Sequence, residues 1–454
     1  MRRPVYRFEV RRATPLRDGP GQAPALTLHF DGAPVPADPR DTVASALIAA
    51  GELMTSRSAK YRRPRGAYCL LGDCGTCLVR VDGQPNVRAC LTPVRDGMQV
   101  ASQNSYGDLD PTALIDAVFP GGIDHHHLVV RPRLANSVMQ GVARNLTGFG
   151  VLPDRAPTGP AWREEHVPEV LVVGAGRSGR VAAARLLAAG LDVLLLDRRD
   201  RADLLAWDPA PLPAALRPGL GVFAAYPHEG LWAAAAALAD DAPGDRSDAR
   251  SGARSDGPPA PTLHIIRPRH VILALGAHQP TIPVAGNDIP GVVSARGLRH
   301  LLARTGRTLA GPVVVIGAGA AARAHADALG ATLVGPDEVR RIVGRRRVKA
   351  VETSSSRLPA RLVALAPEPA PACELAAQAG AALRWTGSGF APICDPDGRV
   401  QLRAAEHPLA DDPPATPPWT LWATGALHEH DAGEAVAAAL LRQRARPVQK
   451  ASHD

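Results

Sequence analysis

Residues 65–90 read RGAYCLLGDCGTCLVRVDGQPNVRAC and contain four of the six cysteines in this 454-residue chain. The four follow the spacing C-x4-C-x2-C-x12-C and are Cys69, Cys74, Cys77 and Cys90. Three thiolates on one tight loop, with a fourth placed one short strand later, match the ligand arrangement of a plant-type 2Fe–2S cluster. The spacing therefore predicts that these four side chains hold a pair of iron atoms.

The residues between the cysteines explain how the loop can close. Gly72 and Gly75 have no Cβ, so backbone amides can approach the cluster sulfides and the chain can take left-handed angles. Leu78–Val81, followed by Asp82-Gly83, predicts a strand and a hairpin turn that return Cys90 to the same metal pair. A zinc knuckle and a disulfide pair are the alternatives. Zinc favours two C-x2-C halves, and a long charged chain without a secretion signal argues against disulfides.

Length and composition indicate an ordinary folded protein with two or three domains. The chain is too long for one core, and its 45% apolar and 21% charged residues are typical of globular proteins. No run of about 18 uncharged apolar residues occurs, so we expect no membrane span. The net charge is +8, but aromatic residues make up 4% and no nucleic-acid motif is present, so we expect no nucleic-acid partner. The first residues, MRRPVYR, lack the apolar part of an export signal, which predicts a cytoplasmic protein.

The pattern before the cysteines predicts a β-grasp ferredoxin-like domain over residues 1–105. Residues 6–12 and 26–30 alternate apolar and polar side chains as half-buried strands do. Thr42 is a suitable cap for a helix over 43–50, which Gly51 ends.

Residues 106–165 are expected to form a helical connector and a proline-rich linker. A helix is predicted to begin at Asp110, with Pro111 in its first turn. His125–His127 follow, but three consecutive side chains point in different directions and lack the spacing of helical metal ligands. A linker from Pro153 to Pro168 ends this region.

A dinucleotide-binding fold begins at residues 169–179, which read EVLVVGAGRSG. A buried strand leads into G-x-G-x-x-G and an alanine-rich helix leaves it. Gly174 permits the tight turn, Gly176 lets the backbone approach a pyrophosphate, and Gly179 lets the helix pack on the strand. Asp197 ends the next strand, where an acidic side chain can bind the ribose hydroxyls of adenosine.

A second nucleotide motif follows a low-complexity insertion at about 240–260. Residues 270–277, HVILALGA, predict a strand that ends in small residues around Gly276. Residues 311–322, GPVVVIGAGAAA, then repeat the nucleotide pattern with Gly317 and Gly319. The acidic residue that follows, Asp337, lies beyond the next strand, so a nicotinamide nucleotide in this second site is left open.

Residues 419–426, WTLWATGA, predict the strand that closes over a flavin, with Gly425 at its end and a helix over 432–442. Most flavoproteins of this architecture have Asp where this chain has Ala426. The first site can therefore hold FAD or a nicotinamide dinucleotide. Cys373 and Cys394 have no partner at ligand spacing. The predicted fold class is α/β, with a Rossmann-type FAD/NAD(P)-binding domain over 166–454.

Two segments carry a family resemblance. Residues 56–66, SRSAKYRRPRG, and residues 144–150, RNLTGFG, resemble sarcosine oxidase alpha subunits and their relatives in opine oxidases, hydroxyproline and proline dehydrogenases and hydrogen cyanide synthase. All four cysteines are present, which makes the chain more similar to the dehydrogenase branch. The resemblance implies a 2Fe–2S domain fused to an FAD/NAD(P)-binding domain.

The same resemblance implies an electron-transferring alpha-type subunit of a multi-subunit amine or amino-acid dehydrogenase or oxidase. Substrate is then oxidised on a separate flavoprotein beta subunit, and no catalytic residue is predicted on this chain. A stand-alone NAD(P)H-dependent reductase with FAD and a 2Fe–2S cluster is one alternative. A nucleotide-binding scaffold subunit without turnover is another.

Overall fold

The computed structural model describes residues 14–20, 24–59, 61–105, 133–134, 136–138, 140–141, 162–236, 262–403, 419–425 and 433–445. Some predicted features lie outside these residues: the strand at 6–12, the helix from Asp110, the histidines 125–127, the segment 144–150, the insertion at about 240–260 and Ala426. No helix within the described ranges is long and apolar enough to cross a membrane.

The chain folds into two compact units that do not follow sequence order. The first unit contains Met1–Ala156 and Thr281–Pro367, and the second contains Pro157–Pro280 and Glu368–Asp454. The cysteine loop and the second nucleotide motif therefore share one unit, while the first nucleotide motif belongs to the other. The domain boundaries expected from the sequence, 1–105, 106–165 and 166–454, stay a prediction.

The amino-terminal part of the first unit is a mixed five-stranded sheet with the order β3-β2-β8-β6-β7. Its strands are β2 (Leu26–Phe30), β3 (Ala33–Ala37), β6 (Leu78–Val81), β7 (Gln84–Arg88) and β8 (Gln99–Ser102). Helix α1 (Val43–Ala49) packs its buried face on this sheet. The Thr42 hydroxyl caps the helix by accepting a hydrogen bond from the Ser45 amide at 3.3 Å. A short ribbon of β4 (Ser56–Arg57) and β5 (Pro64–Arg65) precedes the cysteines. The predicted strands at 26–30 and 78–81 and the helix after Thr42 are present.

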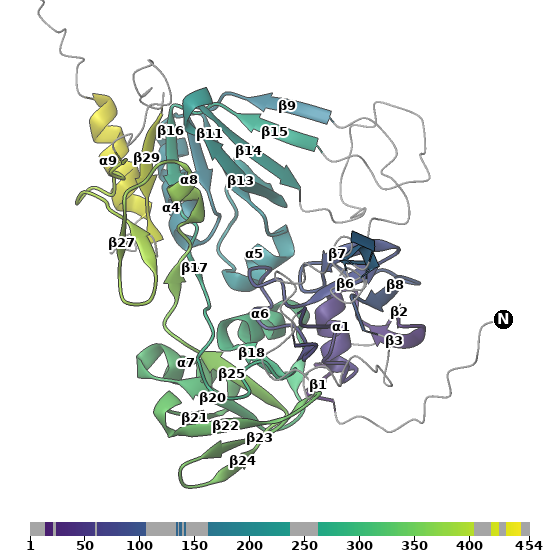
Figure 1. The fold of residues 1–454 in the computed structure, drawn as a ribbon. Coiled ribbons are helices and arrows are strands. Elements are labelled where there is room, and N and C mark those ends of the chain that lie inside the picture. Colours follow the sequence, from purple (N-terminus) through teal and green to yellow (C-terminus); the bar gives the residue numbers. More distant parts are fainter. Residues whose placement is uncertain are drawn as a thin grey trace, which may run out of the picture. The chain divides into compact units, whose positions relative to one another are not determined.

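The first unit also contains a parallel sheet that carries the second nucleotide motif, ordered β18-β25-β20-β21 (Figure 1). Its strands and helices are β18 (Val292–Ser294), α6 (Ala295–Thr305), β20 (Val313–Gly317), α7 (Gly319–Leu329), β21 (Thr332–Val334) and β25 (Leu362–Ala366). A three-stranded antiparallel sheet with the order β22-β23-β24 lies between β21 and β25 in sequence. Its strands, and the 3-10 helix before them, are η3 (Pro336–Glu338), β22 (Val339–Gly344), β23 (Val348–Thr353) and β24 (Arg357–Pro359).

A buried ion pair joins the two parts of this unit. The Arg307 guanidinium donates to Asp41 from Nε at 2.9 Å and from its second terminal nitrogen at 2.5 Å. It also donates to Asp18 at 2.6 Å. Arg307 is 6% exposed and Asp41 is fully buried. Beside this pair, β1 (Leu16–Arg17) and β19 (Thr308–Leu309) form an antiparallel bridge, and one hydrophobic core continues across both parts.

Replacing Arg307 with alanine should lower the free energy of unfolding by about 3–5 kcal/mol, because the buried Asp41 carboxylate loses its counter-charge. Urea unfolding followed by circular dichroism measures this change. Arg341→Ala, which removes an exposed pair with Glu352, is the control and should have little effect. Equal free energies of unfolding for the two variants would contradict a stabilising role for the Arg307–Asp41 ion pair.

The second unit contains a parallel sheet with the order β12-β11-β10-β16-β29. Its strands and helices are β10 (Val170–Val173), α4 (Arg177–Ala188), β11 (Val193–Asp197), α5 (Arg201–Trp207), β12 (Leu216–Pro218), β16 (His270–Leu273), β29 (Thr420–Ala423) and α9 (Gly433–Ala445). Val170 and Val172 face the core formed with α4 and α9, whereas Leu171 and Val173 face an opposite core. Both faces of β10 are therefore covered, as its continuous apolar sequence predicts.

A second sheet, ordered β13-β14-β15-β9, covers the opposite face of the first. Its strands are β9 (Trp162–His166), β13 (Leu220–Tyr226), β14 (Leu231–Ala236) and β15 (Thr262–Ile266). The remaining elements of this unit are η2 (Pro227–Glu229), β17 (Ala277–His278), β26 (Ala370–Pro371), α8 (Glu374–Gln378), β27 (Leu383–Trp385) and β28 (Phe390–Pro392).

β9 differs from the sequence-based expectation, and β13 and β14 lie in a stretch for which no element was predicted. The second half of the expected linker 153–168 contains β9, because it pairs in parallel with β15 over five residues. The alanine-rich stretch after Asp197 contains β13 and β14, which pair antiparallel. Long-range pairing with β15 gives β9 its strand character, whereas β13 and β14 form a local hairpin around η2.

Candidate iron–sulfur and dinucleotide sites

The four cysteines of the loop converge on one place in the first unit. All four are free thiols. The Sγ atoms of Cys77 and Cys90 are 3.4 Å apart, and the Cys69 thiol is hydrogen-bonded to the thiols of Cys74 and Cys90. Cys69, Cys77 and Cys90 are 1%, 2% and 7% exposed, whereas Cys74 faces solvent. The residues that the spacing predicts to be ligands are thus brought together.

Backbone amides surround the sulfur of Cys69. It accepts from the amides of Leu71 at 3.5 Å, Asp73 at 3.2 Å and Cys74 at 3.3 Å. Hydrogen bonds from the Cys74 and Cys90 thiols, and then from these amides, hold the pKa of Cys69 far below its ordinary value. A sulfur site with inward amides suits an anionic iron–sulfur centre, so the donor set fits a 2Fe–2S cluster.

Glycine is needed within this loop for the reason that the sequence suggests. Gly72 and Gly75 have φ angles of 83° and 65°, in the left-handed region that side chains disfavour. At Gly72 a Cβ would also lie 2.6 Å from the Leu91 side chain. These angles turn the chain between successive cysteines.

The loop rests on the N-terminus of helix α6. The Ser294 amide donates to the Tyr68 carbonyl at 2.8 Å. A Cβ on Gly297 would lie 1.9 Å from the Cys69 carbonyl oxygen, so the two backbones touch. Burial raises the pKa of Tyr68 to about 12, so this ring stays neutral between them. The positive end of the α6 dipole therefore lies beside the chain that carries the first cysteine.

Gly297→Ala should separate the cysteine loop from α6. Alanine is intrinsically better in a helix by about 1 kcal/mol, so any loss of stability reports the lost contact. We expect a loss of about 1–3 kcal/mol from overpacking and a lower iron content per chain. Iron and acid-labile sulfide assays measure the latter. Ala303→Ser, on the exposed side of the same helix, should keep the iron content of the parent chain.

The first nucleotide motif has close backbone packing at two glycines. A Cβ on Gly174 would lie 2.3 Å from the Ala274 carbonyl oxygen, and one on Gly179 would lie 1.9 Å from the Gly174 carbonyl oxygen. Gly176 has open space in front of its Cα. Gly425 approaches this turn, since a Cβ there would lie 3.3 Å from the Ser178 hydroxyl. Gly276 follows β16, the strand beside β10.

This geometry matches the roles predicted for the glycines, namely a tight turn, an open approach and close helix packing. It leaves room for a pyrophosphate at the start of α4, where helix amides and dipole favour an anion. Dinucleotide binding by these residues stays a prediction.

Asp197 is placed at the end of β11 as predicted, but its carboxylate already has four donors. It accepts from the Ala175 amide at 2.7 Å and the Arg199 amide at 2.9 Å, and from the Arg199 guanidinium at 3.0 and 2.8 Å. Burial raises the pKa of this carboxyl, but the Arg199 guanidinium and the two amides more than offset burial, so the pKa lies below its ordinary value. A ribose would have to replace the Arg199 side chain. Sequence reasoning missed Arg199, although its position two residues after the acid was a signal.

Arg199→Ala should destabilise the second unit by about 1.5–3 kcal/mol at pH 7, because a buried carboxylate loses charged donors. Without the guanidinium, burial dominates and the pKa of Asp197 rises. Protonation of Asp197 in the variant removes the buried charge. The loss of unfolding free energy relative to the parent therefore becomes smaller as pH falls from 7 towards about 4. Urea unfolding across this pH range tests the sign. A deficit that grows on acidification would refute it, and exposed Arg198→Ala is the control.

The second nucleotide motif is built on β20 and α7. A Cβ on Gly317 would lie 2.5 Å from the Ala366 carbonyl oxygen, and Gly319 has a φ of 79°. Ala322, in the third glycine position, is buried against this turn. Asp337 is exposed in η3 and not at the end of β21. The fold at Gly317 and Gly319 is that of a nucleotide turn, while the usual ribose-binding acid is absent from the β21 end.

Comparison with known proteins supports the iron–sulfur domain and the fold of the chain. Residues 23–105 match the family described as a 2Fe-2S iron-sulfur cluster binding domain. The chain is 32% identical over 181 residues to sarcosine oxidase subunit alpha of Rhizobium meliloti (strain 1021), which covers 38% of this chain and 18% of that subunit. It is 40% identical over 83 residues to hydrogen cyanide synthase subunit HcnA of Pseudomonas aeruginosa, covering 18% of this chain and 79% of that subunit.

Among solved structures, L-proline dehydrogenase from P. horikoshii has a TM-score of 0.64 at 18% identity and covers 96% of this chain and 77% of that chain. This likeness concerns the fold, and it confirms the predicted α/β class with a ferredoxin-like domain and a Rossmann-type FAD/NAD(P) fold. The match to sarcosine oxidase subunit alpha spans less than a fifth of that relative.

Fold and cysteine site together define a protein in which a 2Fe–2S cluster binding domain is joined to a Rossmann-type fold, and the prediction of a 2Fe–2S cofactor is confirmed. The chain belongs to the family that includes sarcosine oxidase alpha subunits and hydrogen cyanide synthase subunit HcnA. The family resemblance predicted from residues 56–66 is thereby confirmed.

Proposed function

We propose that the chain is the electron-transferring alpha-type subunit of a multi-subunit flavoprotein dehydrogenase or oxidase acting on CH–NH donors such as sarcosine, an opine or a proline-like amino acid. One observation supports this most strongly: four free thiols converge at the spacing of a 2Fe–2S ligand set, and two matched relatives, of sarcosine oxidase and of hydrogen cyanide synthase, are named as subunits. The cysteine loop packs on the half that carries the second nucleotide motif, through the contact between Cys69 and Gly297. The proposed cluster site and that motif therefore belong to one folded unit.

The proposed cofactors have complementary electron chemistry. A bound flavin accepts a pair of electrons, whereas a 2Fe–2S cluster accepts one electron at a time. Together they convert a two-electron transfer into two one-electron transfers. The chain's part is to hold the groups and set their surroundings. The amides at Cys69 stabilise negative charge on sulfur, and packing against α6 limits movement of the loop.

We assign FAD to the first nucleotide site, and the second site is the candidate for NAD(P). Gly174, Gly176 and Gly179 would hold the pyrophosphate, and Gly276 and Gly425 leave space at the ends of neighbouring strands. Asp197 would meet the ribose once Arg199 moves aside. Gly317 and Gly319 would form the second turn. The ligands of the cluster are Cys69, Cys74, Cys77 and Cys90.

Substrate oxidation is assigned to a flavoprotein beta subunit. The relatives matched are themselves named as subunits, of sarcosine oxidase and of hydrogen cyanide synthase. The proposal places the assembly in the cytoplasm, where reducing conditions keep thiols available for iron.

A stand-alone NAD(P)H-dependent reductase is the second candidate. It is favoured by one observation: the nucleotide half that touches the cysteine loop is the second one, in which Gly317 and Gly319 form the turn. In that case NAD(P)H alone would deliver electrons through the chain.

Anaerobic reduction of the purified chain, followed by visible absorption, separates the two candidates. We expect sarcosine or L-proline to bleach flavin and cluster only when the cognate beta subunit is added, and NAD(P)H alone to have little effect. Cys90→Ser should abolish most iron binding and lower transfer to a one-electron acceptor by more than about tenfold, since the cluster loses a ligand. Cys394→Ser is the control and should behave as the parent chain. Rapid bleaching by NAD(P)H alone would favour the reductase, and full transfer by Cys90→Ser would exclude both.

A further inference from the structure

A group of three side chains lies on two neighbouring strands of the second sheet, and none of the three is a residue of a predicted nucleotide motif. Strand β9 carries Glu164 and His166, and β15 carries His264. In the parallel register Glu164 is paired with His264, and His166 with Ile266. Register partners in a parallel pair point to the same face, as do residues two apart on a strand. Glu164, His166 and His264 therefore share one face.

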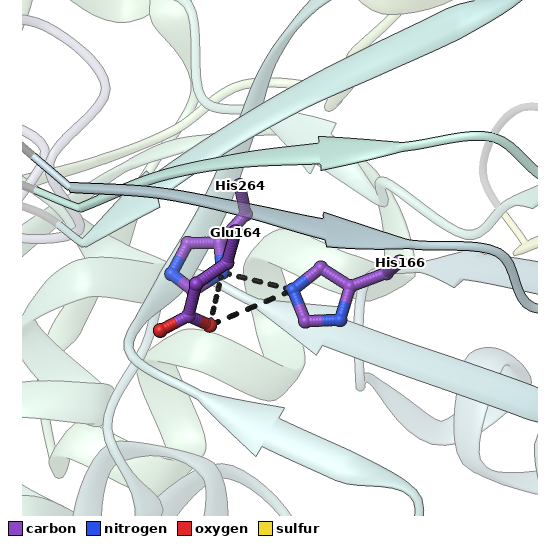
Figure 2. Close-up of side chains that lie close together, drawn as sticks. All are labelled: Glu164, His166 and His264. Atoms are coloured by element: carbon purple, nitrogen blue, oxygen red, sulfur yellow. Dashed lines mark hydrogen bonds and ion pairs between the residues drawn. The ribbon is translucent and has the colours of Figure 1, made fainter.

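The side chains also converge, as Figure 2 shows. His166 Nε2 lies 3.0 Å from His264 Nδ1. A carboxylate oxygen of Glu164 lies 3.4 Å from His264 Nδ1 and 3.8 Å from His166 Nε2. Zinc bonds to nitrogen and oxygen are about 2.0–2.2 Å, so two ligands of a tetrahedral ion are about 3.3–3.5 Å apart. The three atoms lie near that spacing without any movement of the backbone.

The type of each donor narrows the choice of ion. Two imidazole nitrogens and one carboxylate oxygen suit zinc and its first-row neighbours, whereas calcium and magnesium favour oxygen alone. His264 is 9% exposed and so is held in place, while the Glu164 side chain is 58% exposed and leaves one side open. Three protein ligands and an open side are the arrangement of a zinc site that keeps a water molecule.

We propose that Glu164, His166 and His264 form a binding site for a zinc-type divalent cation. The ion links β9, which among the described strands pairs on one side only, to β15. The two histidines are 98 positions apart in the chain, so the ion fastens the outer strand to a distant segment. This site is independent of the cysteine loop and of the proposed function.

Metal binding by the intact, iron-loaded chain tests the site. Chain cleared of loosely bound metal is titrated with Co²⁺ alone, and with Zn²⁺ in competition, while its iron content is monitored. We expect one Co²⁺ per chain with the absorption of a four-coordinate ion, displaced by Zn²⁺. His166→Ala and Glu164→Gln should each weaken binding by at least about 100-fold, since removal of a direct ligand costs no less than loss of its supporting residues.

Two control variants separate this site from other histidines. His278→Ala removes a histidine that contacts the Glu374 carboxylate at 3.0 Å and lies outside the group formed by Glu164, His166 and His264. Replacing histidines 125–127 with asparagine removes the consecutive histidines. Both controls should bind as the parent chain does. The proposal is overturned if Glu164→Gln and His166→Ala bind normally with intact circular dichroism, or if binding is lost in either control.

Discussion

The contact between the cysteine loop and helix α6 is the constraint on which the first unit depends. At Gly297 the helix backbone touches the Cys69 carbonyl, and no side chain fits between them. The Ser294 amide donates a hydrogen bond to the carbonyl of Tyr68, the residue before Cys69. The cysteine loop is therefore supported by the part of the unit that carries the second nucleotide motif, and the Arg307–Asp41 pair joins the same two parts at a second point.

This arrangement explains why the two compact units cut across the sequence. The ferredoxin-like part needs α6 to complete its core, and α6 belongs to the segment after residue 281. Electrostatics favour the same pairing, because a helix N-terminus stabilises negative charge nearby. A cluster site of this kind differs from a ferredoxin attached by a flexible linker, because helix α6 of the second fold packs directly against the cysteine loop.

Local sequence was sufficient for the elements whose signal is local. The cysteine spacing, the glycines around Gly174 and the apolar strands before them each follow from short-range rules, and they are found where predicted. Arg307 and Asp41 are 266 positions apart, so no local rule could join them. Strand β9 was missed because its sequence, WREEH, is polar and follows proline-rich chain. Its strand character comes from pairing with β15, and the convergence of Glu164, His166 and His264 comes with that pairing.

The central claim is that the four thiols of the loop hold a 2Fe–2S cluster inside the first unit. Electron paramagnetic resonance of the purified chain after dithionite reduction tests it most directly, because a reduced 2Fe–2S cluster carries one unpaired electron. The account predicts one spin per chain in the parent protein and its loss in Cys77→Ser. A spectrum without that signal, from a folded chain prepared without oxygen, would contradict the account.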